Sequence, residues 1–229
     1  MSALAGTVSN DSRIRSVSRV HSFARAAVWA LPVWAAMLFL GTLTHQPDPQ
    51  TDMAGFAAYV TTTEFLLSHL VNSIAGAAIG SIGVIALMLY LQDTRAVSRA
   101  IAGMVLVVSG NTLTSSVFGA AAFAQTAIGN AFLAGKVDAL DYYNLVYAAP
   151  LFGTVIVGLL LFMIGAGFVG SAITASGRFP RWTGWVYAIT AIGFVLSNFT
   201  VPVGQTPMSA LLFITTVVVA WKVRQDRGK

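Results

Sequence analysis

The chain has 229 residues, of which 56% are hydrophobic and only 9% are charged, and its formal net charge is +5. A soluble domain carries about 25% charged residues, so this chain could not cover its surface against water, and the composition indicates an integral membrane protein. The lack of cysteine excludes disulfides, thiolate metal sites and cysteine catalysis, and the scattered basic residues form no stripe with aromatics that would indicate nucleic-acid binding.

The chain begins with a polar, serine-rich segment, residues 1–25, that carries four arginines. We expect it to be a loosely ordered basic tail. The apolar run that follows, 26–44, is longer than the hydrophobic region of a signal peptide and has no convincing cleavage site, so it predicts a retained first span. Pro32 lies in its first turns, where a missing N–H costs little.

The second and third spans are predicted at 62–91 and 100–124. The connection before them is rich in Pro and Asp, and its later part, 54–60, could lie along the membrane interface as a short helix. Thr61 and Glu64 form a capping-box pattern at the start of the second span. A tight turn with two arginines separates the second span from the third.

The remaining spans are predicted at 146–172, 183–200 and 208–221, with a basic tail at 223–229. The connection before the fourth span ends in aromatic residues suited to the headgroup level. No connection is long enough to hold a separate domain. The pattern therefore predicts one all-α domain, 26–222, built as a bundle of six transmembrane helices.

The distribution of charge fixes the expected orientation. Twelve of the thirteen Lys and Arg residues lie in the two tails and in the second and fourth connections, which together have a net charge of +9. The other three connections, with the first turn of the second span, hold only Lys136 against five acidic residues, a net charge of −4. Because short segments rich in Lys and Arg stay in the cytoplasm, we expect both termini there, in a bacterial inner membrane.

Small residues mark the expected helix contacts. Glycines that share one face of a membrane helix let a neighbouring backbone approach closely, which strengthens dispersion contacts. The second and fourth spans carry such residues, and this packing is their simplest explanation. The glycines we assign to helix packing are Gly76, Gly80, Gly83, Gly165 and Gly170.

The third span is unusually polar at its centre, where six of the eight residues 109–116 are polar. Ser and Thr can bond to the carbonyls of their own helix, so they are cheap to bury. Asn111 needs a partner on another helix or water. Two explanations therefore stay open for Asn111 and for nearby Ser115: they hold the bundle together, or they line a polar cavity.

Polar side chains concentrate toward the outer half of the expected bundle. Ionisable residues inside a membrane are functional candidates by default. Glu64 also has an explanation as a helix cap, and His69 as an interfacial histidine bonded to a neighbour. If these side chains converge, they form an outward-facing ligand pocket. Its candidate residues are Glu64, His69, Asn72, Asn111, Ser115, Tyr147 and Asn198.

Enzymatic and cofactor chemistry has weak support. His45 and His69 lie on the same side of the membrane and could ligate haem or a metal, but their spacing matches no ligand motif. No hydrolase, metalloprotease or phosphate-loop motif is present. We therefore predict no cofactor and no metal site, and we expect that the protein is not an enzyme.

The turn after the fourth span, residues 176–185, has the sequence SGRFPRWTGW. It resembles the cytoplasmic turn of a family of small six-span bacterial integral membrane proteins of unknown function. The His-x-x-Asn-Ser start of the second span, from His69, is similar in style. The resemblance covers about a tenth of the chain. It implies the same architecture, but it implies no activity because none is assigned to the family.

Three functional hypotheses follow. The protein could bind or transport a small or amphipathic molecule in the outward-facing pocket, as a homodimer or within a larger membrane complex. It could be an accessory or assembly subunit whose polar residues only hold the bundle together. It could be a membrane enzyme or a haem or metal carrier that uses His69 with His45 or Glu64. The lipid bilayer is the expected partner in all three cases.

Overall fold

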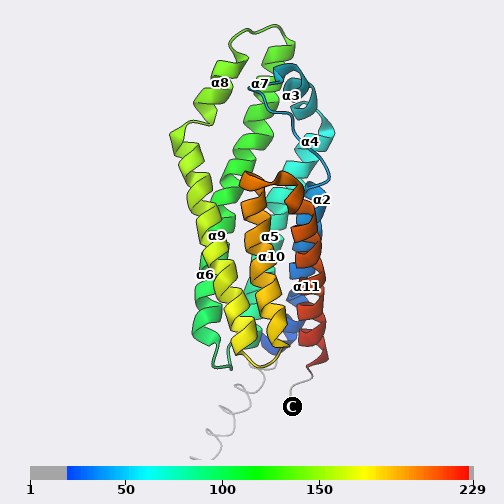
Figure 1. The fold of residues 1–229 in the computed structure, drawn as a ribbon, viewed down its shortest axis with the longest axis vertical. Coiled ribbons are helices and arrows are strands. Elements are labelled where there is room, and N and C mark those ends of the chain that lie inside the picture. The colour runs from blue at the N-terminus through cyan, green and yellow to red at the C-terminus, as the bar shows by residue number, and fades with distance from the viewer. Residues whose placement is uncertain (1–19, 227–229) are drawn as a thin grey trace, which may run out of the picture.

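The computed structural model describes residues 20–226, and they form helices joined by short connections (Figure 1). The all-helical prediction is confirmed, since no strand occurs within 20–226. Most of the predicted N-terminal tail and the last three residues lie outside the described range. The helices are α2 (Ala30–Gly41), α3 (Met53–Val60), α4 (Thr63–Leu67), η1 (Ser68–Ala75), α5 (Gly76–Leu91), α6 (Val97–Ala120), η2 (Ala121–Gln125), α7 (Thr126–Leu133), α8 (Ala139–Val146), α9 (Ala149–Ala175), α10 (Arg181–Thr200), η3 (Pro202–Gly204) and α11 (Gln205–Gln225).

Within residues 20–226, five helices are long and apolar enough to cross a membrane. α10 is also long, with 20 residues, but it is not one of the five; it carries Arg181 in its first turn and Asn198 in its last. The five helices are Val20–Gly41, which ends in α2; Thr63–Leu91, which joins α4, η1 and α5; Val97–Leu133, which joins α6, η2 and α7; Ala149–Ala175, which is α9; and Pro202–Gln225, which joins η3 and α11.

Six helices form a closed ring. Going around it, α2 packs on α5, α5 on α6, α6 on α9, α9 on α10, α10 on α11, and α11 on α2 (Figure 1). We call the end where Val20 and Asp226 lie the basic end, and the opposite end, which carries α3, α4, α7 and α8, the distal end.

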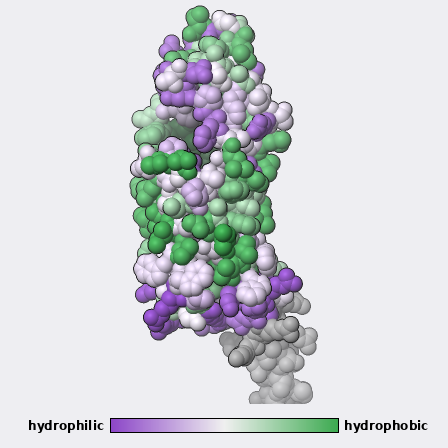
Figure 2. Space-filling view, turned by 45° about the vertical axis from the view of Figure 1, so that its right-hand side comes forward, coloured by the Kyte–Doolittle hydropathy of each residue, from purple (hydrophilic) through white to green (hydrophobic). Residues whose placement is uncertain are grey.

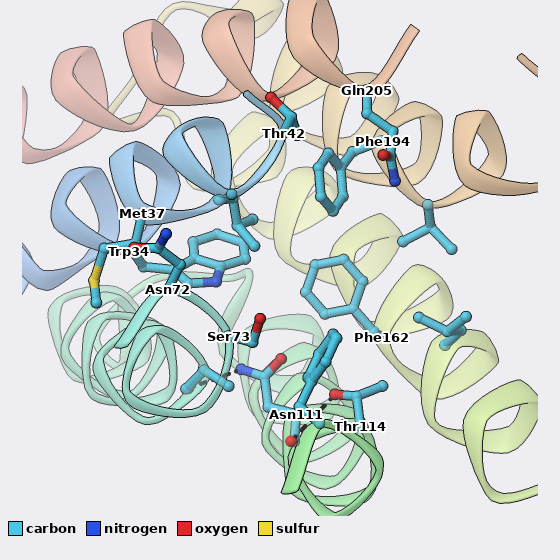
Figure 3. Close-up of a pocket in the computed structure, with 16 residues that line it drawn as sticks. Trp34, Met37, Thr42, Asn72, Ser73, Asn111, Thr114, Phe162, Phe194 and Gln205 are labelled. Atoms are coloured by element: carbon cyan, nitrogen blue, oxygen red, sulfur yellow. Dashed lines mark hydrogen bonds between the residues drawn. The ribbon is translucent and has the colours of Figure 1, made fainter. Parts of the chain in front are cut away.

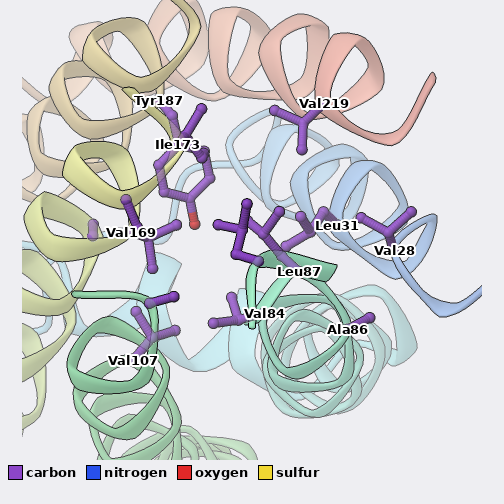
Figure 4. Close-up of a cluster of buried hydrophobic side chains, with 14 of the residues drawn as sticks. Val28, Leu31, Val84, Ala86, Leu87, Val107, Val169, Ile173, Tyr187 and Val219 are labelled. Carbon is purple, nitrogen blue, oxygen red and sulfur yellow. The ribbon is translucent and has the colours of Figure 1, made fainter. Parts of the chain in front are cut away.

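The basic half of the ring is filled by apolar side chains from all six helices. Leu31, Leu87, Ile173 and Tyr187 are almost completely buried there, and Val219 of α11 closes the cluster from the other side (Figure 4). Lipid tails are as apolar as these side chains, so burying the side chains gives no hydrophobic driving force between the helices. Tight van der Waals packing of this kind is therefore what holds a membrane bundle together.

Glycines allow the closest approaches between neighbouring helices. A Cβ atom at Gly110 of α6 would lie 2.7 Å from both the Gly158 carbonyl oxygen and the Phe162 nitrogen of α9. A Cβ atom at Gly170 of α9 would collide with the Gly184 carbonyl oxygen of α10. These backbone contacts leave no room for a side chain, so they fix where α9 lies against both of its neighbours.

The other predicted packing glycines face side chains or backbone on the adjacent helix. Gly80 and Gly83 of α5 face Trp34 and Leu31 of α2, with closest Cβ distances of 2.7 Å. Gly165 of α9 faces the Val107 nitrogen of α6 at the same distance. Gly76 has ordinary contact room beside Met37, at 3.6 Å, so it is the least constrained of the set.

The distal end extends beyond the ring as a separate small core. α3 packs on α7, and α7 on α8, around a cluster that includes Phe56, Phe65 and Ile128. The continuous helix Val97–Leu133 has 37 residues, which corresponds to about 55 Å against a hydrocarbon thickness of about 30 Å. α7 therefore projects past the bilayer unless the helix is steeply tilted.

The surface of the molecule fits a membrane setting. Figure 2 shows hydrophobic side chains over the middle of the bundle, hydrophilic side chains along the basic end, and a mixed surface at the distal end. At the basic end, Arg178 donates to the Tyr90 carbonyl and lies over the Tyr90 ring, 4.6 Å from its centroid. The Tyr90 hydroxyl donates to Asp226 at 2.6 Å, so the C-terminal helix is tied to α5.

Three local predictions can be compared with the structure. The short helix predicted at 54–60 is confirmed as α3. The helix cap predicted at Thr61 is wrong by one residue, because Thr62 accepts the hydrogen bond from the Phe65 N–H at 3.2 Å. The third apolar helix begins at Val97 and continues past the predicted end at 124 to Leu133, since no proline interrupts it.

The α6–α9 contact gives a direct test of the packing. We expect Gly110→Val to destabilise the protein, because the added carbons would overlap the backbone of α9, and overpacking costs about 1–3 kcal/mol. Thermal unfolding of the purified protein in detergent, followed by the loss of its monodisperse chromatographic peak, should begin several degrees lower, an amount in line with about 1 kcal/mol or more.

Gly167→Val is the matched control, because a Cβ atom at Gly167 of α9 has nothing within 4 Å. It makes the same change in helix propensity without the collision. Equal destabilisation by both variants would contradict the packing described for Gly110.

Candidate functional site: a cavity in the distal half of the ring

A cavity of about 200 Å³ lies inside the distal half of the ring (Figure 3). Every helix of the ring contributes to its wall, from α2 around to α11. A second cavity of about 180 Å³ adjoins it and lies among α6, α9 and α10. Thr114, Phe118, Leu159, Phe194, Val195 and Gln205 line both cavities. We call these two adjoining cavities together the chamber. The filled basic half of the ring closes the chamber on one side.

Asn111 is the most buried polar residue of the first cavity, at 7% exposure. Its Nδ2 donates to the Ala77 carbonyl and to the Ser81 hydroxyl of α5, both at 3.1 Å. These bonds join α6 to α5 and use both amide protons. The Oδ1 atom of Asn111 is left as a hydrogen-bond acceptor beside the cavity. Asn111 thus has both roles that its sequence position left open.

The π-helix η1 supplies two more polar groups, Asn72 and Ser73. A π-turn is wider than an α-turn, so it changes which residues face inward, and such segments are frequent at functional sites. Neither side chain forms a hydrogen bond within the described residues. Figure 3 shows Ser73 with its hydroxyl directed into the space between Trp34 and Asn111. Both groups are available to a ligand or to water.

Aromatic rings form much of the remaining wall. Trp34 of α2 and Phe162 of α9 meet edge to face, with ring centroids 5.9 Å apart. Phe194 of α10 lies across the cavity from Trp34 (Figure 3), and Phe118 of α6 also lines the wall. Aromatic walls with a few placed polar groups are the usual composition of small-molecule sites.

An amide pair lies where α10 meets α11. Nε2 of Gln205 donates to Oδ1 of Asn198 at 3.2 Å, across the short connection that contains η3. Gln205 lines both cavities, and exposed Asn198 lines the second. This pair offers a hydrogen-bonding group at the distal side of the chamber.

Neither cavity has a charged lining residue among residues 20–226: no Asp, Glu, Lys, Arg or His lines either one. An ionised ligand would therefore lose its hydration without a countercharge, which is costly in an apolar site. The uncharged wall favours a neutral molecule that is mostly apolar and carries a hydroxyl, carbonyl or amine.

His69 does not line the cavity. Its Nδ1–H donates to the Phe65 carbonyl at 3.0 Å, one turn earlier in the same helix. Its ring packs against Phe65, with centroids 4.2 Å apart, and against Phe118, at 6.1 Å. His69 therefore lies just behind the wall and holds the aromatic ring of Phe118, which does line the cavity.

Three other candidate residues also lie away from the lining. Glu64 is exposed in the first turn of α4. Ser115 is next to the lining residue Thr114 but is not part of the wall. Tyr147 stacks on Tyr143 in the distal core, with centroids 4.5 Å apart. Burial and the nearby Asp48 charge raise the pKa of Tyr143 above its ordinary value. Of the seven candidates, the chamber brings together Asn72, Asn111 and Asn198.

Each histidine of the suggested ligand pair lies beside a backbone carbonyl of its own segment, His69 beside that of Phe65. His45 is exposed, and its ring nitrogen lies 3.0 Å from the Thr44 carbonyl. Within the part of the chain that the structure describes, no group of three His, Asp or Glu side chains is arranged to hold a metal ion.

The sequence did not identify several of the residues that line the cavities, and the reasons are physical. Trp34 and Phe162 lie inside apolar runs, where an aromatic residue is as expected facing lipid as facing a cavity. Gln205 lies in what was predicted to be a turn, but it begins α11. Thr114 belonged to the polar run of the third span, and that run was the one signal that pointed to it.

In comparisons with known proteins, no family model, no curated protein and no solved structure matches the chain. The resemblance to a family of small six-span membrane proteins therefore stays a prediction. What the protein does must be argued from the cavity and the helices around it.

Proposed function

We propose that the chain is a six-span protein of a bacterial inner membrane, with both termini cytoplasmic, that binds a small neutral amphipathic molecule in the chamber. α10 is the sixth span in this proposal. It is 20 residues long, enough for about 30 Å, and it is packed in the ring between α9 and α11. The basic end, which carries most of the positive charge, then faces the cytoplasm.

The observation that carries the binding proposal is the contrast between the two halves of the ring. Six helices fill the basic half with apolar side chains, yet the distal half keeps about 200 Å³ of space beside unpaired polar groups. An engineered protein cavity of about 150 Å³ is already large enough to bind benzene. The chamber has room for a molecule larger than that.

The accessory-subunit hypothesis has one observation in its favour. Asn111 and His69 are both hydrogen-bonded to backbone carbonyls, as purely structural residues would be. That hypothesis, however, expects no cavity beyond a few waters. Asn72 and Ser73, which form no such bonds, and the chamber beside them favour ligand binding.

Binding can be tested with 1-aminoanthracene, a neutral aromatic amine whose fluorescence rises in apolar sites. In lipid nanodiscs we expect a saturable fluorescence component above the partitioning background. Leu159→Trp should remove this component or raise its Kd at least about tenfold, because Leu159 lines both cavities and the larger ring would fill them.

Leu160→Trp is the matched control, since Leu160 is the next residue on α9 and is 47% exposed on the outer surface. Leu160→Trp should leave the Kd of 1-aminoanthracene unchanged, and it should give the same fluorescence background from probe dissolved in the lipid. If empty nanodiscs and the unaltered protein give the same signal, the binding proposal is wrong and the accessory role takes its place.

The orientation has an independent test. Reporter enzymes fused after Gly135 and after Gly204 should show periplasmic activity, and one fused after Gln225 should show cytoplasmic activity, because the connections rich in Lys and Arg resist translocation. Alkaline phosphatase is active in the periplasm and β-galactosidase in the cytoplasm, so fusing both reporters at the same three positions gives two independent readings of each location. A cytoplasmic result at Gly204 would remove α10 as a span.

A further inference from the structure

The chamber extends to the contact between α9 and α10. The second cavity is lined by Val155 and Leu159 of α9 on one side and by Phe194 and Asn198 of α10 on the other. Because it adjoins the first cavity, the space continues from the Asn111 wall to the distal halves of α9 and α10. Asn198 is exposed there.

α9 and α10 are tightly joined in the basic half. There the Gly170 and Gly184 backbones touch, and a Cβ atom at Gly170 would lie 2.8 Å from the Ala188 side chain. The Thr174 hydroxyl donates to the Arg181 carbonyl at 3.2 Å. These contacts hold the two helices together at their basic ends.

In the distal half the two helices pack on different partners. α9 stays on α6, where a Cβ atom at Gly158 would lie 3.0 Å from the Thr114 side chain. α10 stays on α11, where a Cβ atom at Gly193 would lie 3.0 Å from the Met208 sulfur. Gly153 of α9 has nothing within 4 Å. The distal halves of α9 and α10 are therefore separated by the second cavity.

The chemistry at this opening fits an uncharged amphiphile. Phe152, Leu196 and Phe199 are each about half exposed, lie within three residues of the lining residues Val155 and Asn198, and would face lipid tails. Asn198 and Gln205 form an amide pair beside these side chains. Asn198 lies two residues before α10 ends at Thr200. A molecule lying in the leaflet could keep its apolar part against the aromatic rings while its polar group meets the amides.

We propose that the distal halves of α9 and α10 form a lateral portal through which a neutral amphiphile passes from the adjoining leaflet of the membrane into the chamber. This inference rests on the binding function proposed above, and it adds the source and the route of the ligand. The ligand class is a membrane-dissolved molecule with an apolar ring or short chain and one hydroxyl, carbonyl or amine.

The portal can be closed reversibly because the chain has no cysteine of its own. Val155→Cys with Asn198→Cys places one thiol on each side of the opening. Bis-methanethiosulfonate linkers of increasing length then tether the two helices, mass spectrometry confirms the tether, and a reductant releases it. The measurement is the rate at which 1-aminoanthracene fluorescence rises and decays in nanodiscs by stopped flow.

Two further pairs serve as controls. Phe168→Cys with Trp185→Cys tethers α9 to α10 on the exposed surface of the half that is already closed. Leu43→Cys with Val203→Cys joins the exposed connections next to α2 and α11, and it would restrict a route from the aqueous distal side.

The portal predicts that the Val155–Asn198 tether slows association and dissociation together, at least about tenfold, and that reduction restores both rates. The Phe168–Trp185 tether should change neither rate. The portal is overturned if the Leu43–Val203 tether alone slows the probe, or if all three tethers slow it equally, while the binding function stands in both cases. If the unaltered protein shows no saturable signal, the binding function itself fails and the portal with it.

Discussion

The close approach of helix backbones at glycine is the constraint on which the rest of the structure depends. In a membrane, burying apolar surface gives no net gain, so helices associate through dispersion contacts and a few hydrogen bonds. At Gly110 and Gly158 the α6 and α9 backbones meet directly, and at Gly170 and Gly184 the α9 and α10 backbones do. α9 is thereby fixed to two neighbours, and the ring of six helices closes around it.

The chamber lies where the glycine contact between α9 and α10 is left behind, while the α6–α9 contact at Gly158 continues beside it. The basic half combines glycine contacts with a filled apolar core, so nothing can enter there. In the distal half α9 and α10 follow different partners, and the π-helix η1 places Asn72 and Ser73 next to the space that results. Asn111 both joins two helices and lines the cavity: its amide nitrogen holds α6 to α5, and its oxygen borders the cavity.

Much of the fold could be predicted from the sequence because its causes are local. Apolar length and charge mark the long helices, and the glycines of α5 and α9 are spaced to share a face. The need of Asn111 for an interhelical partner also follows directly, since an amide cannot stay unpaired among apolar side chains. Confirmation of the helices does not extend to the sixth span or to the orientation, which remain proposals.

The site could be predicted only in part, because it depends on tertiary geometry. The π-segments η1 and η2 have no recognisable sequence signature, yet they decide which side chains face inward. The sequence placed His69 in the pocket because it is ionisable, but the nearby Phe65 carbonyl holds its ring behind the wall. Trp34 lines the cavity but was not predicted to do so, since nothing in an apolar run distinguishes a ring that lines a cavity from one that faces lipid.

The difference between the two halves of the α9–α10 contact can be measured directly in liposomes by distances between pairs of spin labels. Labels at Phe168 and Trp185 report the closed half, and labels at Phe152 and Phe199 report the half beside the chamber; all four positions are exposed. The account predicts one narrow distance for the first pair, and for the second a broad distribution that narrows when 1-aminoanthracene is added. Two equally narrow distributions that the probe leaves unchanged would contradict it.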